Sequence, residues 1–131
     1  MINVNVFSNE KAWSKRLKKK ELFLNKICKY FPKKYRFINK KISFTVLLSN
    51  NRNIKKLNRA FRKKNKPTDI LSFPSREKIS KNVTYMGDII ISYDFMNKPM
   101  SLNIFEFKDK VVKIFIHGFL HLVGFDHIKF S

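Results

Sequence analysis

The sequence of 131 residues has very little cysteine and no apolar run long enough to span a bilayer. Its one cysteine, Cys28, excludes an internal disulfide and falls in a helical apolar pattern, where a small core residue is expected. The longest nearly apolar stretch, residues 111–125, is interrupted by Lys113, His117 and His121. The first ten residues lack the basic start and apolar run of a signal peptide. These absences predict a cytoplasmic protein without a membrane segment.

Acidic residues are also scarce, with 9 Asp and Glu against 29 Lys and Arg, which leaves a net charge of +20. No acidic residue occurs between Glu21 and Asp69, although this stretch is rich in lysine and arginine. Such a surface is typical of proteins that neutralise phosphates. An AT-rich genome would inflate the lysine content without any ligand, but it would not remove the carboxylates. We therefore expect a nucleic-acid partner.

Four segments have the patterns of β-strands. Alternating or short apolar runs predict strands at residues 2–7, 42–48, 70–73 and 89–91, with Pro74 ending the third. Residues 78–83 are expected to connect the last two strands, and residues 96–103 are ambiguous. No internal repeat and no low-complexity linker interrupts the chain.

Three segments have helical spacing. One amphipathic helix is predicted from Ser8, as its N-cap, to the stop at Pro32, and another begins after the cap residues 49–51. In residues 105–123 the apolar side chains cover almost every direction around a helix, which predicts a central, buried helix.

The alternation of strands and helices predicts an α+β fold of α/β-like character in one domain spanning residues 1–131. We expect a small mixed sheet of about four strands packed with helices. The central buried helix carries the start of an HxxxHxxxxxH motif. The order of the strands cannot be read from these patterns.

The second helix has an apolar stripe formed by Ile54, Leu57 and Phe61. It also has a basic stripe at spacings of three and four, formed by Arg52, Lys55, Arg59 and Arg62. Cations without interspersed acids repel one another, so a binding surface is favoured over an ordinary solvated face. The residues expected to bind RNA phosphates are Arg52, Lys55, Arg59, Arg62, Lys63, Lys64 and Lys66.

All 3 histidines lie in the segment HGFLHLVGFDH, at positions 117, 121 and 127. His117 and His121 are four residues apart, so on a helix both imidazoles reach one ion. Gly124 can end the helix and let His127 approach the same point. Three imidazoles leave a fourth tetrahedral position open, as in catalytic zinc sites. We predict one Zn²⁺ ion here, ahead of nickel, copper or iron.

The spacing of these histidines is similar to the HExxHxxGxxH motif of metzincin proteases, with one difference. Position 118 is Gly118, so the glutamate that would act as general base is missing. A metalloprotease is therefore disfavoured.

Two motifs give the sequence a close resemblance to the YbeY family of bacterial rRNA maturation factors, described as metal-dependent endoribonucleases. HGFLHLVGFDH resembles the family signature HGxLHLxGYDH, with Phe125 in place of tyrosine. LNRAFRKKNKPTDILSFP, residues 57–74, is similar to LNxxFRGKDKPTDVLSFP, with Lys63 and Asn65 as departures. Residues 86–91 resemble the LGDIVI strand of the family.

The resemblance implies roles for individual residues. His117, His121 and His127 would bind zinc, and Arg62 matches the functional arginine of the second motif. Arg62 and His117 are therefore the expected catalytic residues, because guanidinium can stabilise the charge that develops on a phosphate. Asp88 and Asp126 are the acids nearest the motifs, and Asp126 is expected to orient a ligand histidine or cap the turn.

The resemblance implies a single-strand-specific endoribonuclease that acts in 16S rRNA 3'-end maturation and ribosome quality control. Its expected partners are rRNA and the small ribosomal subunit, with ribosomal or assembly proteins in addition. The alternative is a non-catalytic, zinc-containing ribosome assembly factor that binds rRNA, since the sequence contains no general base at position 118.

Overall fold

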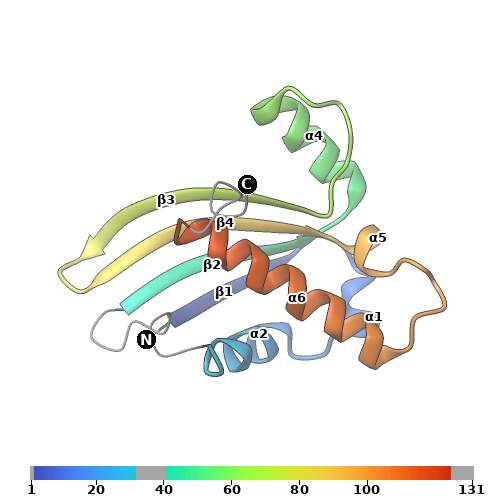
Figure 1. Ribbon diagram of the computed structural model, residues 1–131, viewed down its shortest axis with the longest axis horizontal. Helices are drawn as coiled ribbons and strands as arrows, with labels where there is room; N and C mark the ends of the chain where they lie inside the picture. The colour runs from blue at the N-terminus through green and yellow to red at the C-terminus, as the bar shows by residue number, and fades with distance from the viewer. Residues whose placement is uncertain (1, 32–40, 125–131) are drawn as a thin grey trace.

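The computed structural model describes residues 2–31 and 41–124, and its centre is a four-stranded sheet (Figure 1). The strands are β1 (Ile2–Ser8), β2 (Lys41–Ser49), β3 (Ile70–Ser80) and β4 (Val83–Ser92), in the order β1-β2-β4-β3. β1, β2 and β4 are parallel, and β3 runs antiparallel to β4. The prediction of a mixed sheet of about four strands is therefore confirmed.

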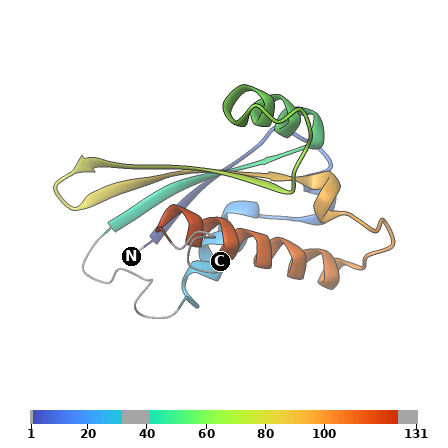
Figure 2. The same cartoon turned by 45° about the horizontal axis from the view of Figure 1, so that its top comes forward.

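Helices cover both faces of this sheet. The helices are α1 (Trp13–Arg16), α2 (Lys20–Cys28), α4 (Asn51–Arg62), α5 (Tyr93–Met96) and α6 (Ile104–Leu122). α4 lies on one face, whereas α1, α2 and α6 lie on the other (Figures 1 and 2). The α+β class is confirmed. Among the helices described, none combines the length and apolarity needed to cross a bilayer.

The main core lies between the sheet and α6. Phe107, Phe115 and Phe119 of α6 are buried, and the last two pack on Phe44 of β2 at ring-centroid distances of 5.8 and 5.6 Å. Trp13 is fully buried, and its indole N–H donates to the Ser49 carbonyl at 2.9 Å. This hydrogen bond satisfies the polar atom of a buried ring.

The prediction of a central, buried helix is correct for the inner side of α6 and wrong for its outer side. Phe105 is 79% exposed, and Lys113 and His117 are also exposed. The reason is that α6 packs with one side on the sheet, so only a stripe of its apolar residues reaches the core. This one-sided packing is what leaves His117 accessible to solvent.

A single first helix was predicted, but the structure breaks it in two. Leu17 is extended and Lys19 adopts a left-handed conformation with φ 49°, between α1 and α2. The break turns α2 toward the free edge of β1, where Glu21 accepts from the Val6 N–H at 3.2 Å. Asn25 of α2 bonds to both the N–H and the C=O of Val4 at 2.9 Å. Side chains thus replace a neighbouring strand at this edge.

β3 is also longer than predicted. Pro74 was expected to end the strand, yet β3 continues to Ser80, and most of the predicted connection is paired strand. β3 lies at the edge of the sheet, where the missing N–H of proline is tolerated. The pairing with β4 shifts register between Pro74 and Glu77, where Arg76 has φ 66°.

Candidate functional site

His117 and His121 converge at the C-terminal end of α6. Their Nε2 atoms are 2.9 Å apart, and the ring centroids are separated by 4.5 Å. His117 is exposed and His121 is half-buried. Two imidazole nitrogens bound to one tetrahedral zinc ion would stand about 3.3 Å apart, given ordinary Zn–N bond lengths. The pair therefore fits two ligands of one metal ion with only a small adjustment.

Gly118 explains how the pair is held next to the sheet. A Cβ at this position would lie 2.7 Å from Cδ1 of Ile70 and 3.0 Å from Cδ1 of Ile89. Glycine thus lets α6 approach β3 and β4 more closely than any other residue would. A side chain at position 118 would point into the sheet, so the packing itself is incompatible with a glutamate base there.

Gly124 ends α6, as the sequence predicts. It has φ 95°, and its N–H donates to the His121 carbonyl at 3.2 Å. The third predicted ligand, His127, and the neighbouring Asp126 lie outside the described residues. Within residues 2–31 and 41–124, no group of three His, Cys, Asp or Glu side chains could hold a metal.

Arg76 is a cation beside this site that the sequence patterns did not single out. A Cβ built on Gly124 would come within 3.0 Å of Arg76 Nη2, so the guanidinium of β3 lies against the end of α6. Its position depends on the irregular pairing after Pro74 and on a positive φ at Arg76 itself. Neither feature has a signal in the sequence, which explains why Arg76 was missed.

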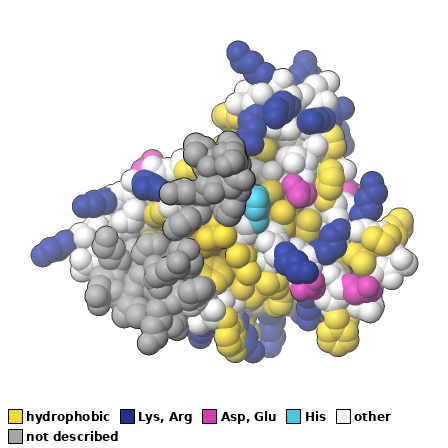
Figure 3. Space-filling model, in the orientation of Figure 1, with side chains coloured by type: hydrophobic (Ala, Val, Ile, Leu, Met, Phe, Trp, Pro, Cys, Tyr) yellow, Lys and Arg dark blue, Asp and Glu magenta, His cyan; other side chains and the backbone are white. Residues whose placement is uncertain are grey.

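The basic stripe lies on α4 as predicted. Asn50 is the N-cap, and its side chain accepts from the Asn53 N–H at 2.9 Å. All seven predicted phosphate-binding residues are exposed. Figure 3 shows blue Lys and Arg side chains over α4 and the cyan histidine surface on one face of the molecule.

Arg62, the last residue of α4, lies against β3 at the edge of the sheet. Its Nη2 donates to the Ser72 carbonyl of β3 at 3.3 Å. Ser72 is two residues from Ile70, whose side chain contacts the Gly118 position of α6. The same strand thus borders Arg62 and supports the helix that carries the histidine pair.

The apolar stripe of α4 departs from the prediction at one residue. Ile54 is fully buried and Leu57 is half-buried, but Phe61 is 68% exposed. The cluster beneath α4 consists of buried Ile54, Leu71 and Ile90, with Leu47, Leu57 and Phe73 packed against it. It is small and does not reach far enough to cover Phe61.

Asp88 belongs to a different part of the molecule. Its carboxylate accepts a short hydrogen bond from the Tyr85 hydroxyl, which also lies 2.6 Å from the Thr45 hydroxyl. Neighbouring Ile89 faces α6, and strand residues alternate, so Asp88 faces the α4 side. Burial and the Asp88 hydrogen bond raise the pKa of Tyr85. Asp88 is therefore not a partner of the histidines.

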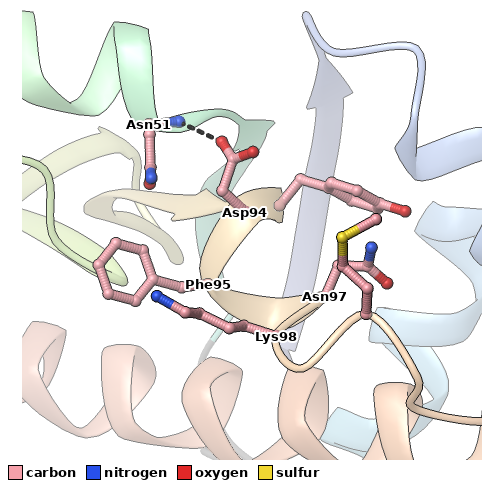
Figure 4. Close-up of a pocket in the computed structure, with 7 residues that line it drawn as sticks. Asn51, Asp94, Phe95, Asn97 and Lys98 are labelled. Carbon is pink, nitrogen blue, oxygen red and sulfur yellow. Dashed lines mark hydrogen bonds between the residues drawn. The ribbon is translucent and has the colours of Figure 1, made fainter.

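A separate pocket of about 450 Å³ lies between α5, the loop after it and the start of α4 (Figure 4). Its polar groups take part in the fold: Asp94 accepts from the Asn51 N–H at 2.8 Å, and Arg16 donates to Asn97 Oδ1 at 3.1 Å. None of the predicted site residues lines it.

Comparison with known proteins gives consistent results. The family model described as Endoribonuclease YbeY matches residues 6–131. The chain is 63% identical over 130 residues to Endoribonuclease YbeY of Pelagibacter ubique, covering 98% of this chain and 85% of that one. It is 37% identical over 128 residues to the protein of that name in Ehrlichia canis, covering 97% and 80%. The solution structure of TM1509 from Thermotoga maritima matches with a TM-score of 0.56 at 28% identity, covering 95% of this chain and 74% of that one.

Proposed function

The chain belongs to the YbeY family of endoribonucleases, and on that basis we propose that it is a zinc-dependent nuclease of single-stranded RNA. Its relatives carry the name endoribonuclease, which supports an RNA-cleaving hydrolase in rRNA processing. The finer parts of the proposal are maturation of the 16S rRNA 3' end and ribosome quality control, on the small ribosomal subunit in the cytoplasm.

The observation that carries the proposal is the convergence of His117 and His121 to 2.9 Å between their Nε2 atoms. Neutral imidazole nitrogens are ordinary zinc ligands, and His127 would supply the third. When bound, the ion would supply Lewis-acid polarisation of a phosphoryl oxygen or a water of lowered pKa. The exposure of His117 leaves the approach to this point open to a phosphodiester.

Arg62 is the proposed charge-stabilising residue. Its hydrogen bond to Ser72 uses one of the five guanidinium N–H donors, so the remaining donors can face a phosphate. The exposed cations of α4 would hold the RNA backbone on either side of the reacting phosphate. His117 would take part in catalysis as a ligand of the metal.

A non-catalytic assembly factor that binds rRNA is the second candidate. One observation favours it: in the described part of the chain, no acidic side chain joins the two histidines in a cluster of three. Gly118 faces the sheet, so a general base cannot come from that position. In this reading the zinc ion would stabilise the end of α6 without turnover.

The test is cleavage of precursor rRNA and of immature small subunits by purified, metal-analysed protein. Matched variants are His121→Ala, Arg62→Ala and, as a control on the same helix, Lys113→Ala, whose only described ion pair is to Asp109 at 2.8 Å. We expect cleavage that requires zinc, disappears in the first two variants and persists in the third.

RNA binding without cleavage would support the second candidate, provided that the His121→Ala and Arg62→Ala variants keep the RNA affinity of the wild type. Removal of zinc with a chelator separates the two roles further. For a nuclease, activity is lost at temperatures where the fold persists. For a structural site, chelation would lower the melting temperature, and the protein would show no cleavage with or without zinc.

A further inference from the structure

Phe61 is an aromatic residue exposed among cations. It is 68% exposed at the last turn of α4, and Arg59, Arg62, Lys63 and Lys64 lie within three residues of it. In Figure 1 the C-terminal end of α4 stands farther from the sheet than its start. Single exposed apolar residues are common on proteins, so exposure alone assigns no role. The surroundings of Phe61 are what distinguish it.

The ring is held in place from below. Phe61 contacts Phe73 of β3 edge to face, with centroids 5.5 Å apart and an interplanar angle of 70°. The hydrogen bond from Arg62 to the carbonyl of Ser72 fastens the same turn of α4 to the same strand. Phe61 is therefore positioned by two contacts, while most of its ring surface faces water.

The backbone of the loop that follows Phe61 is fixed as well. Asn58 is 3% exposed, and its side-chain amide donates to the Lys66 carbonyl at 2.9 Å. The N–H of Lys64 donates to the Asn58 carbonyl at 3.2 Å. The loop that carries Lys63, Lys64 and Lys66 is thus folded back against α4, next to the turn that carries the exposed ring.

We propose that Phe61 is a stacking platform for one unpaired base of the RNA strand whose phosphates the surrounding cations neutralise. A fixed aromatic ring next to positive charge is the arrangement that binds single strands, because every base has a face to stack. Bases inside a duplex are already stacked and cannot reach the ring. Phe61 thus selects single-stranded over double-stranded RNA, a role that deepens the proposed function and rests on it.

An apolar protein partner would be a different occupant of the same surface. The charge around Phe61 argues against it, since every charged residue from Arg52 to Lys66 is a lysine or an arginine. A strand of phosphates neutralises these charges as the base stacks, whereas an apolar surface would have to desolvate them.

The experiment measures the affinity of an unstructured 12-nucleotide RNA and of the same sequence as a blunt duplex, by fluorescence anisotropy at fixed salt. The variants are Phe61→Ala, Phe61→Tyr, which keeps a stacking face, and Phe105→Ala, a 79% exposed phenylalanine at the start of α6. Phe61→Ala should weaken single-strand binding about 5- to 150-fold, the loss of one stacked base. Phe61→Tyr and Phe105→Ala should bind as the wild type does, and duplex affinity should not change.

Equal weakening of single-strand and duplex binding by Phe61→Ala would overturn the proposal, because it would indicate a general disturbance of the surface. Unchanged RNA binding with weaker binding to small-subunit particles would overturn it in favour of a protein partner. Cleavage of precursor rRNA is measured in parallel, so the two proposals fail separately. Weaker single-strand binding by Phe61→Ala, without cleavage by the wild type, supports the Phe61 proposal and contradicts the nuclease. Cleavage by the wild type, with no effect of Phe61→Ala on RNA binding, supports the nuclease and contradicts the Phe61 proposal.

Discussion

Gly118 sets the distance between the histidine helix and the sheet. Replacement by alanine would place a methyl group 2.7 Å from Cδ1 of Ile70 and 3.0 Å from Cδ1 of Ile89. Overpacking of this kind in a dense core costs about 1–3 kcal/mol. We expect Gly118→Ala to lower the free energy of unfolding by that amount in urea, and to weaken zinc binding because His117 and His121 move with α6.

The matched control removes the atom that the new methyl group meets. Ile70→Val deletes Cδ1, so the double variant should recover part of the stability lost in Gly118→Ala. Strictly additive losses would show that Ile70 does not limit the approach of α6. A stable Gly118→Ala protein with full zinc affinity would contradict the packing argument altogether.

Cys28 is the second residue with a measurable consequence. It is 3% exposed, and burial raises the pKa of its thiol from 9.0 to about 12. Because the folded state binds this proton more tightly, the contribution to stability is complete below pH 9 and is lost as the pH rises toward 12. At pH 8, a water-soluble disulfide reagent should react with Cys28 far more slowly in the folded protein than in urea. Prompt labelling of the folded protein would contradict the burial of the thiol.

Individual residues differ in how well the sequence predicts them. The spacing of His117 and His121 was sufficient to predict that their side chains meet, because a helix repeats every 3.6 residues. The exposure of Phe61 was not predictable, since it depends on how far the small cluster under α4 extends. The position of Arg76 depends on a register shift in the hairpin, which only long-range pairing determines.

At the scale of elements, α4 depends on other parts of the chain for negative charge. Its first turn contains no acid, although the positive end of a helix dipole favours one. Asp94 of α5 accepts from the Asn51 N–H, and Glu10 accepts from the Asn50 amide at 3.0 Å. The hydrogen bonds from the Ala12 N–H and then from Asn50 lower the pKa of Glu10. The N-terminus of a helix whose own charged residues are all basic is thereby bonded to acids that lie elsewhere in the sequence.

The N-cap of α4 gives a prediction at this scale. Asn50→Ala removes the acceptor for the Asn53 N–H and should lower the unfolding free energy by about 1 kcal/mol. Asn50→Ser keeps a capping oxygen but loses the bond to Glu10, so it should be closer to the wild type. The urea midpoints of both variants give the comparison, and an equal loss in both would mean that Glu10, not the cap, matters.

Element boundaries were predicted where the local pattern decides them. Alternation and helical periodicity predicted the strands at residues 2–7 and 42–48 and the helix at 105–123, each within one residue of the bounds of β1, β2 and α6. The break at Lys19 and the continuation of β3 past Pro74 were not predicted. Both result from sheet edges, because α2 turns to satisfy the open edge of β1 and Pro74 lies on the opposite edge. The order of strands is not encoded in any single segment.

At the scale of the whole molecule, a net charge of +20 by itself would attract RNA to every part of the surface. The arrangement of α4 instead predicts a preferred face, because Lys and Arg side chains gather over α4 on the side of the molecule that also shows histidine surface (Figure 3). A diffuse attraction over the whole surface and a preferred binding face predict different effects on RNA binding when one positive charge is removed at different places.

Salt dependence distinguishes them. For single-stranded RNA, log K falls with log salt by about 0.7 for each phosphate that the protein neutralises. Arg59→Ala on α4 should reduce the slope by about that amount, whereas Lys26→Ala, an exposed cation on α2, should leave it unchanged. Titrations at four salt concentrations are sufficient, and equal changes in the two variants would support a diffuse charge effect.

Of the helices that the structure describes, only α4 lies on its face of the sheet, over a cluster whose buried members are Ile54, Leu71 and Ile90. The large core on the other face does not depend on it, so α4 can open by local unfolding while the rest of the protein stays folded. Its backbone amides should exchange with deuterium faster than those of α6. Bound RNA should slow this exchange, since a ligand that requires the closed helix stabilises it. The helix that we propose as the RNA-binding element would then also be the one that RNA makes rigid.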